Sequence, residues 1–290
     1  MASTQTLQRR IKSVKSTRQI TKAMELVAAS KMRKATDVAQ RGRSYREAAH
    51  DLLSRLATLT DVNEHPLYIQ RPVKTRLYVV ITSDRGLAGA YNANVIKLLT
   101  KAAIDDSKKS VKTRAIILGT RGVQFVRHIK DIELTAAFTN MADQPTANDL
   151  RPILQTIVRE YSDKQVDDVR LLYTAHRSNI LQEAVSLPLL PARLDETDSN
   201  AVDSLESVTF EPSVSAVLDN VTERLLEVQL WQALLESIAS EHSMRMLSMK
   251  NATDNANELI DDLTLAFNTV RQANITQEIA EITGGVEAMK

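Results

Sequence analysis

The sequence predicts an α/β protein in which two long helices, one at each end of the chain, pair as an antiparallel coiled coil around an inserted α/β domain. Three observations predict it. Residues 1–41 contain neither glycine nor proline, and neither occurs between Pro212 and Gly284. An apolar repeat near 3.5 residues runs through the second of these segments, as in a coiled coil. Between the two segments, short β-rich stretches alternate with helical ones.

The composition is that of a globular protein and excludes several classes of function. The chain has 290 residues, 43% hydrophobic residues and a net charge of +1, so its overall charge favours no particular partner. It has no cysteine, which excludes disulfides, thiolate metal sites and cysteine nucleophiles. No apolar run approaches the roughly 18 residues of a membrane helix, and the basic start precedes no apolar signal core. We expect neither a membrane span nor export.

The first element is a helix predicted over residues 1–60. Its apolar positions recur at helical spacing among alanines, which allow helices to approach closely. They are Leu7, Ile11, Val14, Ile20, Met24, Val27, Met32 and Val38. Residues 1–46 carry twelve basic and two acidic side chains, so this helix is strongly positive.

The last element is a helix predicted over residues 212–290. Its uninterrupted part, about 70 residues, would measure on the order of 100 Å. Steps of four and three from Val214 define a seam on which fourteen of eighteen positions are apolar. The seam continues through Leu218, Val221, Leu225, Val228, Gln232, Leu235, Ala239, His242, Met246, Met249, Thr253, Ala256, Ile260, Leu263, Phe267, Val270 and Asn274. Residues 195–262 hold fifteen acidic and three basic side chains, which favours pairing with the positive first helix.

The segment 75–211 is predicted to form a Rossmann-like domain with a mainly parallel sheet, because strands and helices alternate along it. The predicted strands are 76–82, 114–119, 132–138, 169–175 and 207–210. The predicted helices are 90–106, 122–129 and 146–163.

The motifs of this segment give little sign of chemistry. "ITSDRGLAGAYN" and "LGTRGVQ" follow strands, where a phosphate loop would stand, but both lack the spacing of dinucleotide and Walker loops. Tight strand-to-helix turns are the favoured interpretation. The five histidines form no metal-binding pattern and no serine occupies a nucleophile elbow. We expect no catalytic, cofactor-binding or metal-binding residues. Nucleic acid binding is disfavoured because only 4% of the residues are aromatic and the acidic helix opposes the basic one.

Three blocks of the sequence resemble the gamma subunit family of F-type ATP synthases. They are "RRIKSVKSTRQITKAMELVAASKMRKA" (9–35), "SDRGLAGAYNANV" (83–95) and "SEHSMRMLSMKNATDNANELIDDLTLAFNTVRQANITQEIAEITGG" (240–285). The chain departs from the family's usual residues at Ala88, Ala90 and Ala280, and the last of these lies close to a rotor contact.

The resemblance implies a central stalk that rotates inside a ring of three alpha and three beta subunits. Its α/β domain would be a foot on the c ring, beside the epsilon subunit. The stalk would couple proton flow to ATP synthesis or hydrolysis at the beta subunits and help to regulate both, with no active site or cofactor of its own. The resemblance further implies a peripheral protein at the cytoplasmic face of the bacterial plasma membrane.

The resemblance also implies roles for individual residues. Six would contact the surrounding ring: Met24, Arg245, Arg271, Gln272, Thr276 and Glu278. Ile275, Ile279 and Ile282 would form an apolar bearing at the tip, and Glu211 would lie in the foot near the c ring.

Two other functions are compatible with the residues. The α/β domain could belong to a nucleotide-dependent enzyme, although the missing phosphate motif counts against this. The long helices could form a free-standing scaffold or a nucleic-acid adaptor. Nucleotide titration would test the first, and sizing with and without alpha and beta subunits would test the second.

Overall fold

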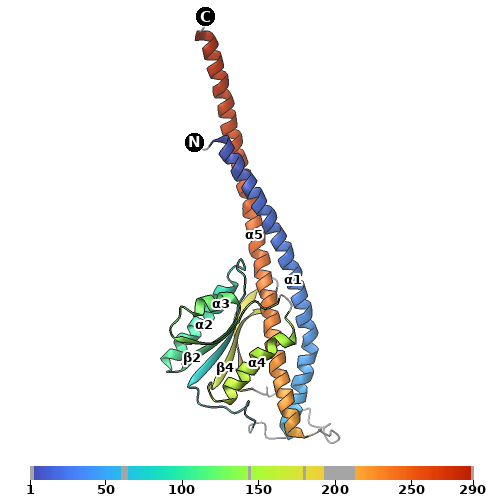
Figure 1. Cartoon of the computed structure of the whole chain (residues 1–290). Helices are drawn as coiled ribbons and strands as arrows, with labels where there is room; N and C mark the ends of the chain where they lie inside the picture. Colours follow the sequence, from blue (N-terminus) through green and yellow to red (C-terminus); the bar gives the residue numbers. More distant parts are fainter. Residues whose placement is uncertain (1–2, 60–64, 143–144, 179–180, 193–212, 289–290) are drawn as a thin grey trace. The chain divides into compact units, whose positions relative to one another are not determined.

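The computed structural model describes residues 3–59, 65–142, 145–178, 181–192 and 213–288 (Figure 1). The chain forms two compact units. One consists of Met1–Ala29 with Arg245–Lys290, and the other is Ser30–Met244. Each long helix contributes to both units.

The two long helices predicted from the sequence are confirmed. Helix α1 spans Thr4–Leu59 and helix α5 spans Val214–Ala288, a helix of 75 residues. Both run through segments almost free of glycine and proline. Inside a helix, each glycine lowers helix stability by roughly 1 kcal/mol and each proline by roughly 3 kcal/mol relative to alanine. Gly284 and Gly285 lie inside α5, close to its carboxyl end.

The unit Ser30–Met244 contains a five-stranded sheet of order β3-β2-β1-β4-β5. The strands are β1 (Thr75–Ile81), β2 (Lys112–Leu118), β3 (Ile132–Phe138), β4 (Asp168–His176) and β5 (Gln182–Leu190). β1 to β4 are parallel, which confirms the mainly parallel sheet, and β5 pairs antiparallel with β4.

Strand β5 was not predicted, because Pro188 argues against a strand unless the strand lies at a sheet edge, which is where β5 lies. The strand predicted at 207–210 falls outside the described residues.

Three shorter helices connect the strands close to where the sequence predicted them. They are α2 (Tyr91–Lys108), α3 (Thr120–Val126) and α4 (Ala147–Ser162). Helices α2 and α3 cover one face of the sheet, whereas α4 and α5 cover the other (Figure 1). β1 alternates between the two cores: Tyr78 and Val80 pack with α2 and α3, and Leu77, Val79 and Ile81 pack with α4 and α5.

The first part of α5 is a layer of this α/β unit. Leu225, Leu226 and Leu230 are almost fully buried in the core that includes β1 and β4. Hydrogen bonds fix the helix to its neighbours: Tyr91 Oη of α2 lies 2.6 Å from Ser237 Oγ, and Ser240 Oγ donates to the Thr174 carbonyl of β4 at 3.0 Å. This part of the α5 seam therefore packs on the sheet. A domain boundary at 211 would separate α5 from the strands and α4, with which it shares a core.

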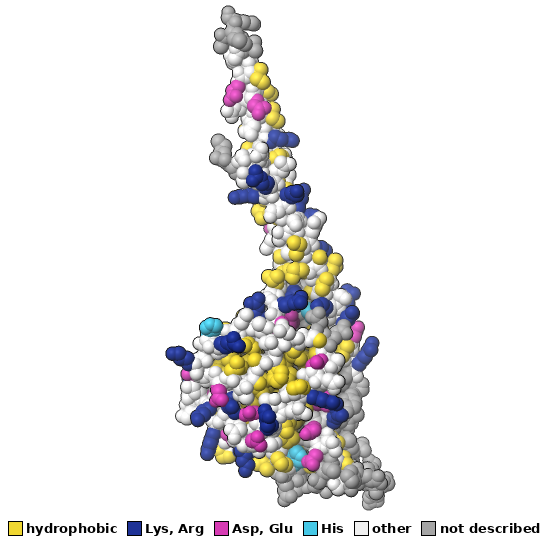
Figure 2. Space-filling model, viewed as in Figure 1, with side chains coloured by type: hydrophobic (Ala, Val, Ile, Leu, Met, Phe, Trp, Pro, Cys, Tyr) yellow, Lys and Arg dark blue, Asp and Glu magenta, His cyan; other side chains and the backbone are white. Residues whose placement is uncertain are grey.

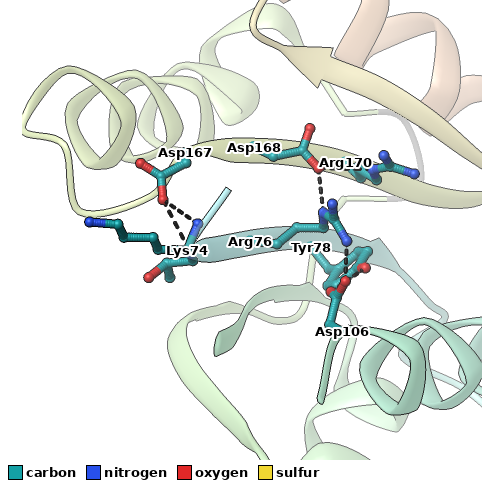
Figure 3. Close-up of polar contacts among 8 residues, drawn as sticks. Lys74, Arg76, Tyr78, Asp106, Asp167, Asp168 and Arg170 are labelled. Atoms are coloured by element: carbon teal, nitrogen blue, oxygen red, sulfur yellow. Dashed lines mark hydrogen bonds and ion pairs between the residues drawn. The ribbon is translucent and has the colours of Figure 1, made fainter. Parts of the chain in front are cut away.

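A polar network ties the amino ends of β1 and β4 to α2 (Figure 3). The guanidinium of Arg76 pairs with both Asp106 and Asp168, and Tyr78 Oη donates to Asp106 Oδ2 at 2.7 Å. Asp167 Oδ2 accepts hydrogen bonds from the backbone N–H groups of Lys74 and Thr75. Because each carboxylate has a partner, these ion pairs and hydrogen bonds offset the desolvation cost of burying the network.

In the unit Met1–Ala29 with Arg245–Lys290, two hydrogen bonds join α1 and α5. The buried hydroxyls of Thr21 and Thr253 lie 2.8 Å apart, and Arg18 Nη1 donates to Asn257 Oδ1 at 3.2 Å. Residue numbers rise along α1 as they fall along α5, so these segments run antiparallel.

The seam predicted for α5 coincides with its buried face, since every seam position from Leu218 to Val270 is buried or half-buried. The apolar positions predicted to form the packed face of α1 were partly wrong. Ile20, Val27 and Val38 are exposed by 58, 55 and 42%, and small residues take their place on the buried face. These are Thr21, Ala28, Ala35 and Ala39. Small side chains allow close packing of helices. The spacing of the large apolar residues alone did not reveal which small residues lie on the buried face.

Candidate interaction surface

The carboxyl-terminal part of α5 is a helix without a buried face. Every residue from Arg271 to Gly285 is exposed, whereas the preceding seam position, Val270, is still half-buried. The three predicted bearing residues, Ile275, Ile279 and Ile282, are exposed by 48, 59 and 68%. Spacings of four and three residues place them on one side of the helix. An apolar strip of this kind is typical of a surface that another protein covers.

The predicted polar contacts of the tip lie on the same exposed helix. Arg271, Gln272 and Glu278 are exposed. The Thr276 hydroxyl donates to the Gln272 carbonyl at 3.0 Å, so its proton is used within the helix and its oxygen can only accept from a partner. Thr283 donates in the same way to the Ile279 carbonyl at 2.7 Å.

Met24 and Arg245 differ from the tip residues in exposure. Met24 is half-buried and lies in sequence between Lys22 and Glu25, which form an ion pair at 3.0 Å. Arg245 is only 8% exposed and engages groups of the chain itself. Glu211, the predicted foot residue, lies outside the described residues.

Large apolar side chains on the exposed side of α1 belong to the candidate surface but were not recognised as such from the sequence. Ile20, Leu26 and Val27 are exposed by 58, 60 and 55%, and Leu265 on α5 by 70%. The buried residues Leu7, Thr21 and Ala28 are separated by multiples of seven and so define one heptad position of α1. Because Ile20, Leu26 and Val27 do not fall on that position, the heptad could have identified them as exposed.

The strand-end loop "SDRG" is a structural turn. The Asp84 carboxylate accepts hydrogen bonds from Thr120 N at 2.9 Å, Thr120 Oγ1 at 2.6 Å and Asn140 N at 3.1 Å. Partial burial favours a higher pKa for Asp84, but these hydrogen bonds outweigh it and hold the pKa below its ordinary value. A carboxylate thus occupies the start of α3, where a nucleotide phosphate would need to approach.

The part of the chain that the structure describes contains neither a cluster of metal-ligating side chains nor a membrane-spanning helix. Its His, Asp and Glu side chains form no group of three that could hold a metal ion. Among the same residues, no helix combines the length and apolar character needed to cross a membrane.

Comparison with known proteins identifies the family. The family described as ATP synthase matches residues 3–289. The ATP synthase gamma chain of Psychrobacter arcticus is 38% identical over 293 residues, which cover all of both chains. The chain belongs to the ATP synthase gamma chain family. The gamma chain of Moorella thermoacetica is 39% identical over 290 residues, again along the whole of both chains.

Solved structures of mitochondrial ATP synthase share the fold. A chain from the Euglena gracilis mitochondrial ATP synthase structure of the OSCP, F1 and c-ring has a TM-score of 0.69 at 17% identity, over 99% of this chain and 94% of that one. A chain from the Tetrahymena thermophila central stalk and c-ring structure has a TM-score of 0.63 at 23% identity, over 80% of this chain and 99% of that one.

Proposed function

We propose that the chain is the rotating central stalk of an F1 ATP synthase, which couples proton flow through the c ring to ATP synthesis or hydrolysis at the beta subunits. Membership of the gamma chain family supports this role. The observation that carries the mechanical part of the proposal is the fully exposed tip of α5, Arg271–Gly285, whose apolar strip lacks a cover within its own unit.

Asymmetry gives such a stalk its effect. A single chain inside a ring of three alpha and three beta subunits cannot make identical contacts with each beta subunit, so it favours a different conformation in each. Rotation exchanges these conformations among the subunits. One proton releases only about 2.3 kcal/mol per 100 mV, so the energy of several crossings must be accumulated before one ATP is made. The accumulation needs a stiff element.

We propose that the stiff element is a left-handed antiparallel coiled coil of α1 and α5. The hydrogen bonds of Thr21 with Thr253 and of Arg18 with Asn257 support it, as does a buried α5 seam that follows a period near 3.5 residues. The domains would then be the helices 1–60 and 212–290 and a foot at 75–211.

In this proposal each site residue predicted from the sequence has a mechanical role. Ile275, Ile279 and Ile282 form an apolar bearing, and Arg271, Gln272, Thr276 and Glu278 contact the ring. Met24 and Arg245 face moving beta segments at the level of the helix pair, and Glu211 lies near the c ring. The epsilon subunit binds beside the foot. The chain is peripheral, at the cytoplasmic face of the bacterial plasma membrane, and the nucleotide chemistry takes place in the beta subunits.

Rotation of a probe tests the proposal directly. Because the chain has no cysteine, a Lys112→Cys variant carries one thiol on an exposed position of the α/β unit, to which a bead can be attached. We expect the chain to elute with alpha and beta subunits in a 3:3:1 assembly and the bead to rotate in three steps per turn when ATP is added. ATP hydrolysis with a stationary bead, or separate elution of the chain, would overturn the proposal.

A further inference from the structure

A groove of about 1050 Å³ lies between α2 and α3, on the side of these helices that faces away from the sheet. Its walls are residues 92–108 of α2 and residues 121–128, which comprise most of α3 and the turn after it. At a rise of 1.5 Å per residue, the α2 wall is about 24 Å long, which matches a helix of roughly 14–16 residues.

The floor of the groove is apolar and open to solvent. Ile104 and Phe125 are exposed by 52 and 40%, and Ile96 is half-buried. Ile96, Thr100 and Ile104 recur every four residues and form one row along α2. The row of α2 that begins one residue earlier, Val95, Leu99 and Ala103, packs in the core on the sheet, so the solvent-facing apolar row is not needed for that core.

The rim of the groove is positively charged. Lys97, Lys101, Lys108 and Arg121 line it together with one acidic residue, Asp105. Asp105 lies 3.5 Å from Lys108, so part of that cation's charge is offset. Within the described part of the chain, Lys97, Lys101 and Arg121 form no ion pair. Figure 2 shows hydrophobic side chains over α2 and α3 with lysine and arginine beside them.

We propose that this groove, formed by α2 and α3, docks an acidic amphipathic helix of another subunit. Its apolar face would cover Ile96, Ile104 and Phe125. Carboxylates on its two flanks would meet Lys97 and Lys101 on one side and Arg121 on the other. A helix in a groove uses this combination, since apolar burial supplies affinity and the charged rims fix orientation.

Binding of a synthetic helix to the full-length chain tests the groove. The probe is a labelled 15-residue peptide with leucines at positions 2, 6, 9 and 13 and glutamates on both flanks. A peptide of the same composition with the leucines distributed around the helix is the control. We expect only the first peptide to bind, and Ile104→Glu and Lys101→Glu each to weaken binding at least tenfold.

Two control variants separate a specific groove from general charge or exposure. Lys112→Glu removes an exposed cation elsewhere in the same unit, and Leu181→Glu changes an apolar side chain exposed by 61%. Both should bind the peptide as the wild type does. Equal weakening by Lys101→Glu and Lys112→Glu, or equal binding of the two peptides, would overturn the proposal. So would binding to phosphatidylglycerol vesicles that depends on Lys101 without any binding of the peptide.

Crosslinking in the assembled ATP synthase then identifies the partner. Ile104→Cys places a single thiol in the groove of a chain that has no other cysteine, and a photoreactive group is attached to it. We expect a crosslink to an acid-rich helical segment of another subunit, absent when the group is attached at Leu181→Cys. No product above that control would overturn the docking proposal while leaving the role as central stalk intact.

Discussion

Gly119 shows how strongly single positions are constrained at the end of β2. Its φ is 96°, and a Cβ there would lie 2.1 Å from the Thr82 carbonyl oxygen. Thr82 in turn donates from Oγ1 to the Leu118 carbonyl at 2.7 Å and accepts from Gly122 N at 3.0 Å. The glycines of "LGTRGVQ" are therefore required by close packing between the ends of β1 and β2, which is a structural reason rather than a nucleotide-binding one.

We predict that Gly119→Ala destabilises the α/β unit by on the order of 3 kcal/mol, because it combines an unfavourable φ with a backbone clash. Thermal unfolding followed by circular dichroism measures the effect. Gly284→Ala is the matched control, since a Cβ at Gly284 meets nothing within 4 Å and alanine favours helix. Equal melting temperatures for wild type and Gly119→Ala would contradict the prediction.

Tyr78 gives the α/β unit a pH dependence at high pH. Burial, followed by the hydrogen bond to Asp106, raises the pKa of Tyr78 to about 12 from an ordinary value of 10.0. The raised pKa means that the folded state holds the phenol proton more tightly than the unfolded state does. This contribution to stability is complete below pH 10 and is lost as the pH rises through about 12.

We predict that the stability advantage of the wild type over Tyr78→Phe narrows between pH 10 and pH 12. At pH 8 the variant should be less stable by about 1–2 kcal/mol, because Asp106 loses a buried donor. Urea unfolding at a series of pH values measures the difference, and other groups that titrate in this range cancel between the two proteins. A difference that stays constant with pH would refute the assignment to Tyr78.

At the scale of elements, the interface of α1 and α5 contains a buried pair of hydroxyls. Thr21 Oγ1 and Thr253 Oγ1 lie 2.8 Å apart, and each is also within reach of a carbonyl on its own helix, Arg18 O at 3.0 Å and Met249 O at 2.9 Å. Two protons can serve only two of these three contacts at once. One threonine therefore donates across the interface while the other donates to its own helix.

A double-mutant cycle tests this pair. Thr21→Val and Thr253→Val should each cost about 1–2 kcal/mol of stability, because each leaves one buried hydroxyl without its partner. The double variant should cost less than the sum of the two, since it removes both polar groups together. Chemical unfolding of the three variants provides the measurement, and strict additivity would show that the hydroxyls do not interact.

The stiffness of α5 leads to a second prediction for this scale. Leu263 is a half-buried seam residue, and proline there removes a helical hydrogen bond and breaks or kinks the helix at a cost of about 3 kcal/mol. We expect Leu263→Pro to separate ATP hydrolysis from proton movement in membrane vesicles, measured with a pH-sensitive dye. Leu263→Ala, which keeps the helix, should still pump protons. Unchanged pumping by the proline variant would contradict the model of a rigid stalk.

The elements differ in how far their sequences predicted them. The long helices and β1 to β4 could be recognised, because glycine and proline are absent from the helices and β-branched residues crowd the strands. β5 could not be recognised, because Pro188 argues against a strand unless the strand lies at a sheet edge. The α5 seam was correct, yet burial of Leu225 and Leu230 against the sheet depends on tertiary contacts that no periodicity contains. Ile20 and Val27 were misplaced because residue type, rather than heptad position, was given priority.

At the scale of the whole molecule, the exposed tip connects the chain to its proposed assembly. Arg271 and Glu278 lie seven residues apart, on the same side of α5. Because a charge of the wrong sign would weaken contacts with the ring without disturbing any buried core, assembly and turnover should respond differently to substitution here.

We predict that Arg271→Glu and Glu278→Arg each slow ATP turnover several-fold while the 3:3:1 assembly still forms. Steady-state ATPase assays and size-exclusion chromatography provide the two measurements. Lys250→Glu, an exposed charge reversal nearer the middle of α5, is the comparison variant. Wild-type rates in both tip variants would indicate that these contacts are dispensable.

The threonine hydroxyls of the tip limit the hydrogen bonds that the tip can donate to a partner. Thr276 and Thr283 each donate to the carbonyl four residues earlier, so neither hydroxyl proton is available to a partner. These two hydroxyls therefore add no donor bond that would have to break as the tip turns past its surroundings. Donor bonds that resist turning at this end should come from exposed side chains such as Arg271 and Gln272 instead.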